Sequence, residues 1–112
     1  MLRYAVLHHT QGEPSDHFDF LVEIAVNQGD LLTFRLPNWP LSQPVEVKRL
    51  KNHRRIYLTY EGEVSNSRGL VSRVAEGTAT FEDRSGALHF ALSSGRSITF
   101  YPDRDDIWIA RE

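Results

Sequence analysis

The chain has 112 residues, enough for one domain with a core of its own and too few for two, so residues 1–112 are expected to form a single domain. It contains no cysteine, which excludes a disulfide framework, a thiolate metal cluster and a cysteine nucleophile. The formal net charge of -2 argues against a general, charge-driven nucleic-acid binder, although a local basic patch could still bind phosphate.

The sequence carries no sign of a membrane or secretory protein. The first residues lack the basic and then apolar run of a secretory signal, and no apolar stretch approaches the roughly 20 residues of a membrane span. We therefore expect a cytoplasmic monomer without a membrane partner.

Short segments rich in aromatic and β-branched residues recur between turn signals along the chain. In chain order, the predicted strands are 2–9, 17–26, 30–36, 56–61, 70–74, 78–83, 87–93, 96–101 and 106–110. Turn residues at 27–30, 84–86 and 93–95 are placed to join neighbouring strands as hairpins, so most pairing should be antiparallel. The pattern predicts an all-β fold, a small barrel or sandwich.

The exception is the segment 37–55, which we expect to be a long connection. Its three prolines would break a central strand and leave room for about one helical turn near 46–52. The run 47–55 holds five cations and a histidine without an acid, a plausible docking point for an anion because arginine gives forked hydrogen bonds to phosphate. The alternative is a solvated polar face.

Two histidines and a carboxylate come together around one turn-rich loop. In an extended strand His17 and Asp19 point to one side while Phe18 and Phe20 point to the other, and a hairpin turn after His9 would set that residue beside them. Two imidazoles and one carboxylate suit manganese, zinc or iron and leave positions open for water or substrate. The alternative is a pair of surface histidines with an exposed ion pair.

The order of these elements resembles the 3′-phosphoesterase domain of bacterial DNA ligase D, a small β-barrel whose motif is His, a short loop and then His-aromatic-Asp-Phe-x-Leu-Glu. Here that motif reads His9, a loop, and then His-Phe-Asp-Phe-Leu-Val-Glu over 17–23. The family's His-x-x-x-Tyr and aromatic-Glu-Gly correspond to His53 with Tyr57 and to 60–62. Its glycine-bearing loop and a later strand resemble 63–69 and 76–81.

The resemblance implies that His9, His17 and Asp19 bind a divalent metal, manganese being the usual cofactor, with zinc or another transition metal as alternatives. It also implies that His53 and Tyr57 lie beside the scissile phosphate as catalytic residues. The family trims DNA or RNA 3′ ends, removing a terminal ribonucleoside and then the remaining 3′ phosphate. A stand-alone, shortened relative would in addition work with a DNA ligase or polymerase in trans.

Two positions depart from the family motif. An arginine that contacts phosphate is replaced by Leu21, and a glutamate is replaced by Lys51, which reverses the local charge. A compensating cation could come from Arg49, Arg54, Arg55 or Arg68, because a phosphate requires charge and donors rather than one fixed position. The alternative is a non-catalytic module that keeps the barrel and the metal and binds nucleic-acid ends or a repair partner.

Overall fold

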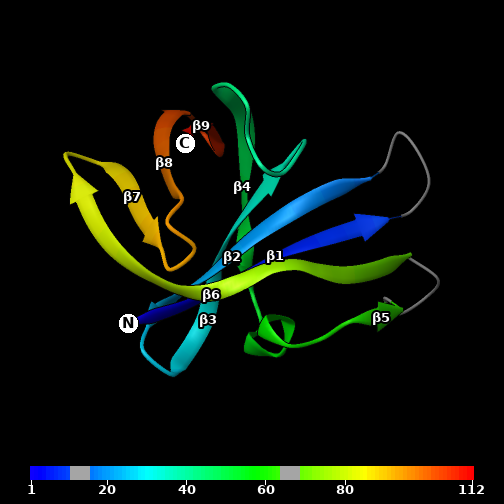
Figure 1. The fold of residues 1–112 in the computed structure, drawn as a ribbon. Coiled ribbons are helices and arrows are strands. Elements are labelled where there is room, and N and C mark those ends of the chain that lie inside the picture. Colours follow the sequence, from blue (N-terminus) through cyan, green and yellow to red (C-terminus); the bar gives the residue numbers. More distant parts are fainter. Residues whose placement is uncertain (11–15, 64–68) are drawn as a thin grey trace.

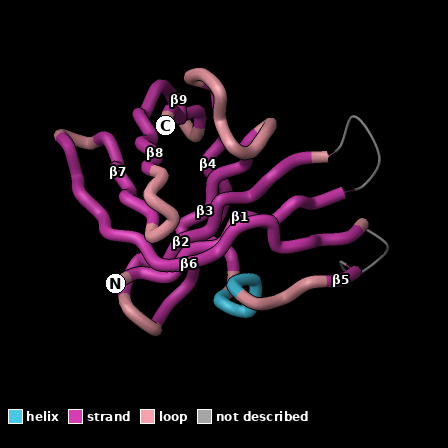
Figure 2. The backbone as a smooth tube through the Cα atoms, in the orientation of Figure 1, coloured by secondary structure: helices cyan, strands magenta, loops and turns pink. Residues whose placement is uncertain are grey.

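Strands of the computed structural model, which describes residues 1–10, 16–63 and 69–112, form one antiparallel sheet that curls into a barrel (Figure 1). The strands are β1 (Leu2–Thr10), β2 (His17–Ala25), β3 (Gln28–Leu36), β4 (Val45–His53), β5 (Gly62–Glu63), β6 (Leu70–Arg84), β7 (Ala87–Leu92), β8 (Ser97–Arg104) and β9 (Ile107–Arg111). A single 3₁₀ turn, η1 (Arg55–Leu58), separates β4 from β5 (Figure 2).

The sheet order is β1-β2-β3-β4-β9-β8-β7-β6-β5, and pairing of β1 with β6 closes the barrel. Among the residues that the structure describes, strand β5 pairs only with the beginning of β6. The predicted all-β, antiparallel barrel is therefore confirmed, and so are its hairpin turns: Asn27, Ser85 and Gly95 all have positive φ at the predicted places. Within the described ranges, no helix is long and apolar enough to cross a membrane.

The predicted long loop over 37–55 is wrong for its second half. Residues 45–53 form β4, a strand paired with β3 on one side and β9 on the other, and no helical turn lies at 46–52. The prolines that suggested a break, at 37, 40 and 44, all precede Val45 and so leave the strand intact. Of the predicted connection, residues 37–44, between β3 and β4, do form a loop.

Two other element predictions also differ from the structure. Residues 55–58 form η1 instead of a strand, because Leu58 packs onto the outside of the sheet, where it is buried. The predicted strands 70–74 and 78–83 are one continuous strand, β6. Gly77, which lies between the two predicted segments, is a point of close approach: a Cβ there would collide with the Ser93 hydroxyl and crowd the Tyr4 ring.

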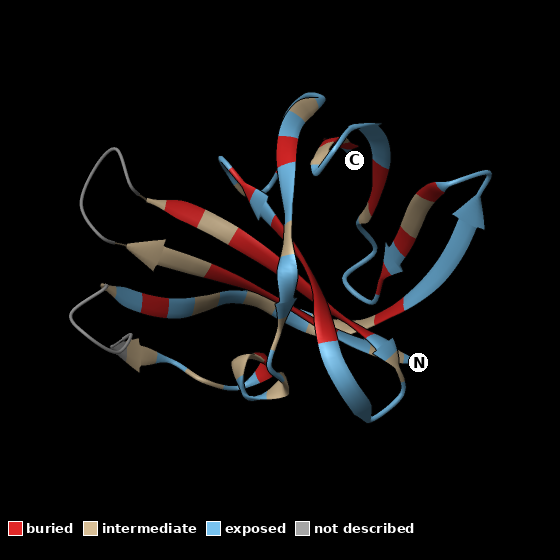
Figure 3. Cartoon of the chain, turned by 180° about the vertical axis from the view of Figure 1, so that it is seen from behind, coloured by how far each residue is buried: buried red, intermediate tan, exposed pale blue. Residues whose placement is uncertain are grey.

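The sheet buries apolar side chains on both of its faces. The barrel interior is filled mainly by aromatic rings, such as Phe34 stacked on Phe100 with centroids 3.9 Å apart. A second set, which we call the outer cluster, lies outside the sheet and consists of Ala5, Leu7, Leu21, Leu31 and Leu58, with Tyr57 packed against it. Because both faces are covered here, β1 and β2 show unbroken buried runs in place of an alternation (Figure 3).

Candidate metal centre

Three potential metal ligands meet where β1 ends and β2 begins. His9 lies directly opposite His17 in the antiparallel register, and Asp19 lies two residues further along β2, opposite Leu7. Because side chains alternate along a strand, His17 and Asp19 share one face with His9. One ligand atom from each of the three residues lies within 4.8 Å of the other two. The connecting turn formers at 11–15 lie outside the described residues.

The distances from His17 to the other two residues fit one shared cation. His9 Nδ1 lies 3.2 Å from His17 Nε2, and His17 Nε2 lies 3.7 Å from Asp19 Oδ2. Two imidazole nitrogens at about 2.1 Å from one ion are about 3.0 to 3.4 Å apart in octahedral or tetrahedral geometry. The two histidine nitrogens are therefore spaced as two ligands of a single ion would be.

The burial of Asp19 supports the same conclusion. The residue is 6% exposed, and Oδ1 has no hydrogen-bond partner among the described residues. Among the described arginines and lysines, the nearest to this carboxylate is Arg35, whose Nε lies 3.8 Å from Oδ1, beyond hydrogen-bond distance. A buried carboxylate oxygen that lacks a donor is costly, and a metal ion would satisfy it. The donor set therefore fits a divalent cation.

A groove of about 350 Å³ opens beside this site and gives a ligand access to His17. It runs across the ends of β2, β3 and β4 and carries both charged and apolar side chains. Its lining residues are His17, Arg35, Leu36, Pro37, Glu46, Val47, Lys48 and Ile107. The candidate ligand His17 thus lies at the edge of an open surface, as a site with exchangeable positions requires.

The predicted phosphate-site pair, His53 and Tyr57, is brought together by the end of β4 and η1. Their ring centroids are 5.8 Å apart at an interplanar angle of 60°. His53 Nδ1 lies 2.9 Å from the Lys51 carbonyl oxygen, which can only accept, so Nδ1 carries a proton and donates it. In the neutral ring the free lone pair then belongs to Nε2.

Both groups lie over the same outer face of the sheet. Tyr57 packs against the outer cluster, which includes Leu7 of β1 and Leu21 of β2. Leu7 is two residues from His9, and Leu21 is two residues from Asp19. Since residues two apart on a strand share a face, Tyr57 and the three candidate ligands occupy adjoining parts of one surface.

Leu21, which replaces the family's arginine, is fully buried in the outer cluster beneath Leu58. Lys51, the other departure from the motif, is an exposed residue of β4. The surface around the candidate ligands is therefore not the cationic one that the family motif would create.

The structure separates the candidate phosphate-binding arginines. Arg49 follows Lys48 along β4 and so points to the opposite face, where its guanidinium lies 5.8 Å from the Trp108 ring. Arg54 is exposed at the beginning of η1. Arg68 lies outside the described residues.

Arg55 is engaged elsewhere, in an ion pair with Glu23. Its Nη2 donates to Glu23 Oε2 at 2.6 Å, and the Arg3 and Asn27 backbone N–H groups donate to the same carboxylate at 2.6 and 2.8 Å. Burial raises the pKa of Glu23, but these hydrogen bonds outweigh it and hold the pKa below its ordinary value of 4.5. Glu23 and Arg55 thus form a structural pair.

Arg35 is the residue that sequence reasoning missed. It lies directly opposite Asp19 across β2 and β3, with Lys48 as its neighbour on β4. The available signal was its place between buried Phe34 and Leu36, which marks it as outward-facing. Without the register, nothing indicated that this outward face was the face of Asp19.

Comparison of the sequence with models of known protein families, and with functionally characterised proteins, gives no match. The resemblance described above therefore rests on the motif residues and their order.

Proposed function

We propose that this protein is a divalent-metal-dependent phosphoesterase that acts on the 3′ ends of nucleic acids and removes a 3′ phosphate or a terminal 3′ ribonucleotide. The observation that carries the proposal is the shared outer face, on which the His9, His17 and Asp19 donors adjoin the His53 and Tyr57 pair. The ligase D phosphoesterase motif combines the same residue types in the same chain order.

Each side chain has a role that its geometry supports. A bound divalent ion, manganese by analogy with the family, supplies positive charge for a phosphate oxygen. His53 donates through Nδ1 to the Lys51 carbonyl, and in its doubly protonated form it would give the Nε2 proton to the leaving oxygen as water attacks phosphorus. The Tyr57 hydroxyl orients the phosphoryl group, and Arg35 is the cation nearest to Asp19.

The test is incubation with manganese and a DNA primer that ends in a 3′ phosphate or a single 3′ ribonucleotide. We expect the wild type to release phosphate only when manganese is present, and His53→Ala to release it at least about 100-fold more slowly, as loss of general acid catalysis predicts. His89→Ala is the matched control, because His89 bonds to Thr99 on another part of the barrel. Absence of product at high enzyme concentration would end the catalytic proposal.

A second candidate function is a non-catalytic module that binds nucleic-acid ends, alone or with a DNA ligase or polymerase in trans. The burial of Leu21 favours it, because the cation that the family uses on phosphate is missing at that position. Tight binding of a 3′-phosphorylated primer without turnover would select this function. Equal affinity for primers with 3′ hydroxyl and 3′ phosphate would reject it.

A further inference from the structure

The segment that carries Tyr57 is too short to hold its own position. The turn η1 contains four residues, and its beginning has no side-chain cap. Its internal hydrogen bonds run from Tyr57 N–H to the Arg54 carbonyl and from the Thr59 and Tyr60 N–H groups to the Ile56 carbonyl. A single 3₁₀ turn is not stable in isolation, so contacts with the barrel must fix it.

One such contact, described above, is the ion pair of Arg55 with Glu23, at the start of η1. Glu23 is 1% exposed and also accepts two backbone N–H groups, so this attachment belongs to the fold as a whole. Its loss would leave several buried groups without partners. A variant there could not separate the position of Tyr57 from general stability.

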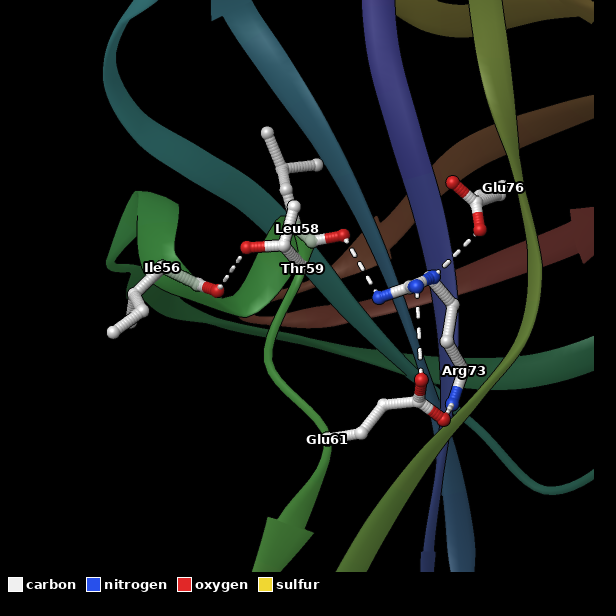
Figure 4. Close-up of polar contacts among 6 residues, drawn as sticks. All are labelled: Ile56, Leu58, Thr59, Glu61, Arg73 and Glu76. Carbon is white, nitrogen blue, oxygen red and sulfur yellow. Dashed lines mark hydrogen bonds and ion pairs between the residues drawn. The ribbon is translucent and has the colours of Figure 1, made fainter.

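The second contact, at the end of η1, is made by Arg73 of β6 (Figure 4). Its Nη1 donates to the Leu58 carbonyl at 3.4 Å, and its backbone N–H donates to Glu61 Oε2 at 3.0 Å. Its Nη2 lies 3.6 Å from Glu61 Oε1, and its Nε donates to Glu76 Oε2 at 2.8 Å. One residue thus attaches both the last residue of η1 and the following segment to the barrel wall.

The two attachments differ in what they would leave behind. The Arg73 side chain is 19% exposed, but those of its partners Glu61 and Glu76 are 49% and 62% exposed. Water can therefore solvate both carboxylates when the guanidinium is removed, and no buried charge is left unpaired. Loss of Arg73 should loosen the end of η1, which the buried Leu58 side chain still holds on the sheet, while the barrel remains folded.

We propose that Arg73 is a positioning residue, which holds Tyr57, and through the ring contact His53, against the outer face beside the candidate metal ligands. Glu61 of the Tyr-Glu-Gly motif would then serve as the carboxylate that forms an ion pair with Arg73. The inference rests on the proposed phosphoesterase function for its effect on rate, but its structural part can be tested without any activity.

The experiment compares Arg73→Ala and Arg73→Lys with Arg84→Ala, a control on the same strand that loses an exposed pair with Glu82. For Arg73→Ala we expect kcat for phosphate release to fall about 10- to 100-fold, as misplacement of a catalytic group predicts, with KM and manganese affinity within about 2-fold. Arg73→Lys should recover part of the rate, because one ammonium can pair with Glu61 but lacks the fork that also reaches the Leu58 carbonyl.

Amide hydrogen exchange supplies the readout that needs no substrate. The Thr59 and Tyr60 amides should exchange at least about 10-fold faster in Arg73→Ala, with the barrel amides unchanged, because only local opening has become easier. Unchanged kcat and unchanged exchange would overturn the proposal. Loss of manganese affinity and faster exchange throughout the barrel would also overturn it, by showing a merely structural role. If the wild type releases no phosphate, the proposed function fails and the exchange result alone decides the positioning claim.

Discussion

Two buried carboxylates on one strand differ in how they are satisfied. Asp19 and Glu23 lie four residues apart on the same face of β2 and are 6% and 1% exposed. Glu23 accepts hydrogen bonds from a guanidinium and two backbone N–H groups. Asp19 has one oxygen without a hydrogen bond among the described residues and two imidazoles close by.

The difference separates a carboxylate that stabilises the fold from one that is poised for a ligand. A buried acid in a structural role has its donors supplied by the chain itself, as Glu23 has. An acid that lacks them lowers stability unless something else binds, and this is typical of functional sites. The following variants test whether Asp19 and Glu23 differ in this way.

Removing Glu23 should produce the largest loss of stability. Glu23→Ala leaves the Arg3 and Asn27 amides without their acceptor and Arg55 without its partner, which we expect to lower the free energy of unfolding by about 3 kcal/mol. Urea denaturation measures it. Glu82→Ala, which breaks an exposed pair, is the control and should leave the midpoint unchanged. Equal effects of the two substitutions would contradict the structural role of Glu23.

Metal should stabilise the protein through Asp19. Manganese at about 100 times its dissociation constant should raise the free energy of unfolding of the wild type by about 2.7 kcal/mol. Asp19→Asn and His17→Ala should abolish that gain, and Asp19→Asn should cost little without metal because it removes an unsatisfied buried charge. Thermal denaturation with and without manganese measures both effects. A gain that survives in His17→Ala would place the metal elsewhere.

Acid should weaken the fold through Glu23. Because the Arg55 hydrogen bond and the two backbone amides hold its pKa below 4.5 despite burial, Glu23 stabilises the fold above its unfolded pKa. That contribution is lost as the pH falls through the lower folded pKa. We therefore expect unfolding to become easier on acidification below about pH 4.5, and the dependence to be shallower in Glu23→Gln. Denaturation at a series of pH values measures this dependence. Parallel curves of stability against pH for the wild type and Glu23→Gln would contradict the prediction.

The smallest expected effect is that of Arg35, which pairs with Asp19 across the strands. Arg35→Ala should change stability by less than about 0.5 kcal/mol, because the side chain is half exposed. It should tighten manganese binding about 3-fold by removing a neighbouring cation, and weaken binding of a 3′-phosphorylated primer. Calorimetric titrations with manganese and with the primer measure the direction of each change in affinity. Two changes of the same sign would show that Arg35 does not act between metal and phosphate.

The sequence indicated the barrel and the three candidate ligands because both depend on local patterns. Turn residues and short apolar strands predicted the hairpins, and alternation predicted that His17 and Asp19 share a face. The strand β4 was missed because its many cations are typical of an exposed loop, whereas its pairing with β3 and β9 makes it a strand. Residue propensity says little about whether a segment forms a strand when pairing with its neighbours decides it.

The surroundings of the site depended on long-range contacts that no local pattern contains. Whether Leu21 is exposed is decided by Leu58, which lies in another part of the chain and covers it. The assignments of Arg55 to Glu23 and of Arg35 to Asp19 follow from the register of the sheet. Arginines in a basic run could be recognised as candidates, but the partner of each one is a property of the folded barrel.

A crystal structure with manganese and phosphate soaked in would test the central claim most directly. We predict one ion, located by its anomalous scattering, at about 2.1 Å from His9 Nδ1 and His17 Nε2 and bound to an Asp19 oxygen, with phosphate between it and Tyr57. An ion bound away from these three residues, or no bound ion at saturating manganese, would contradict the account.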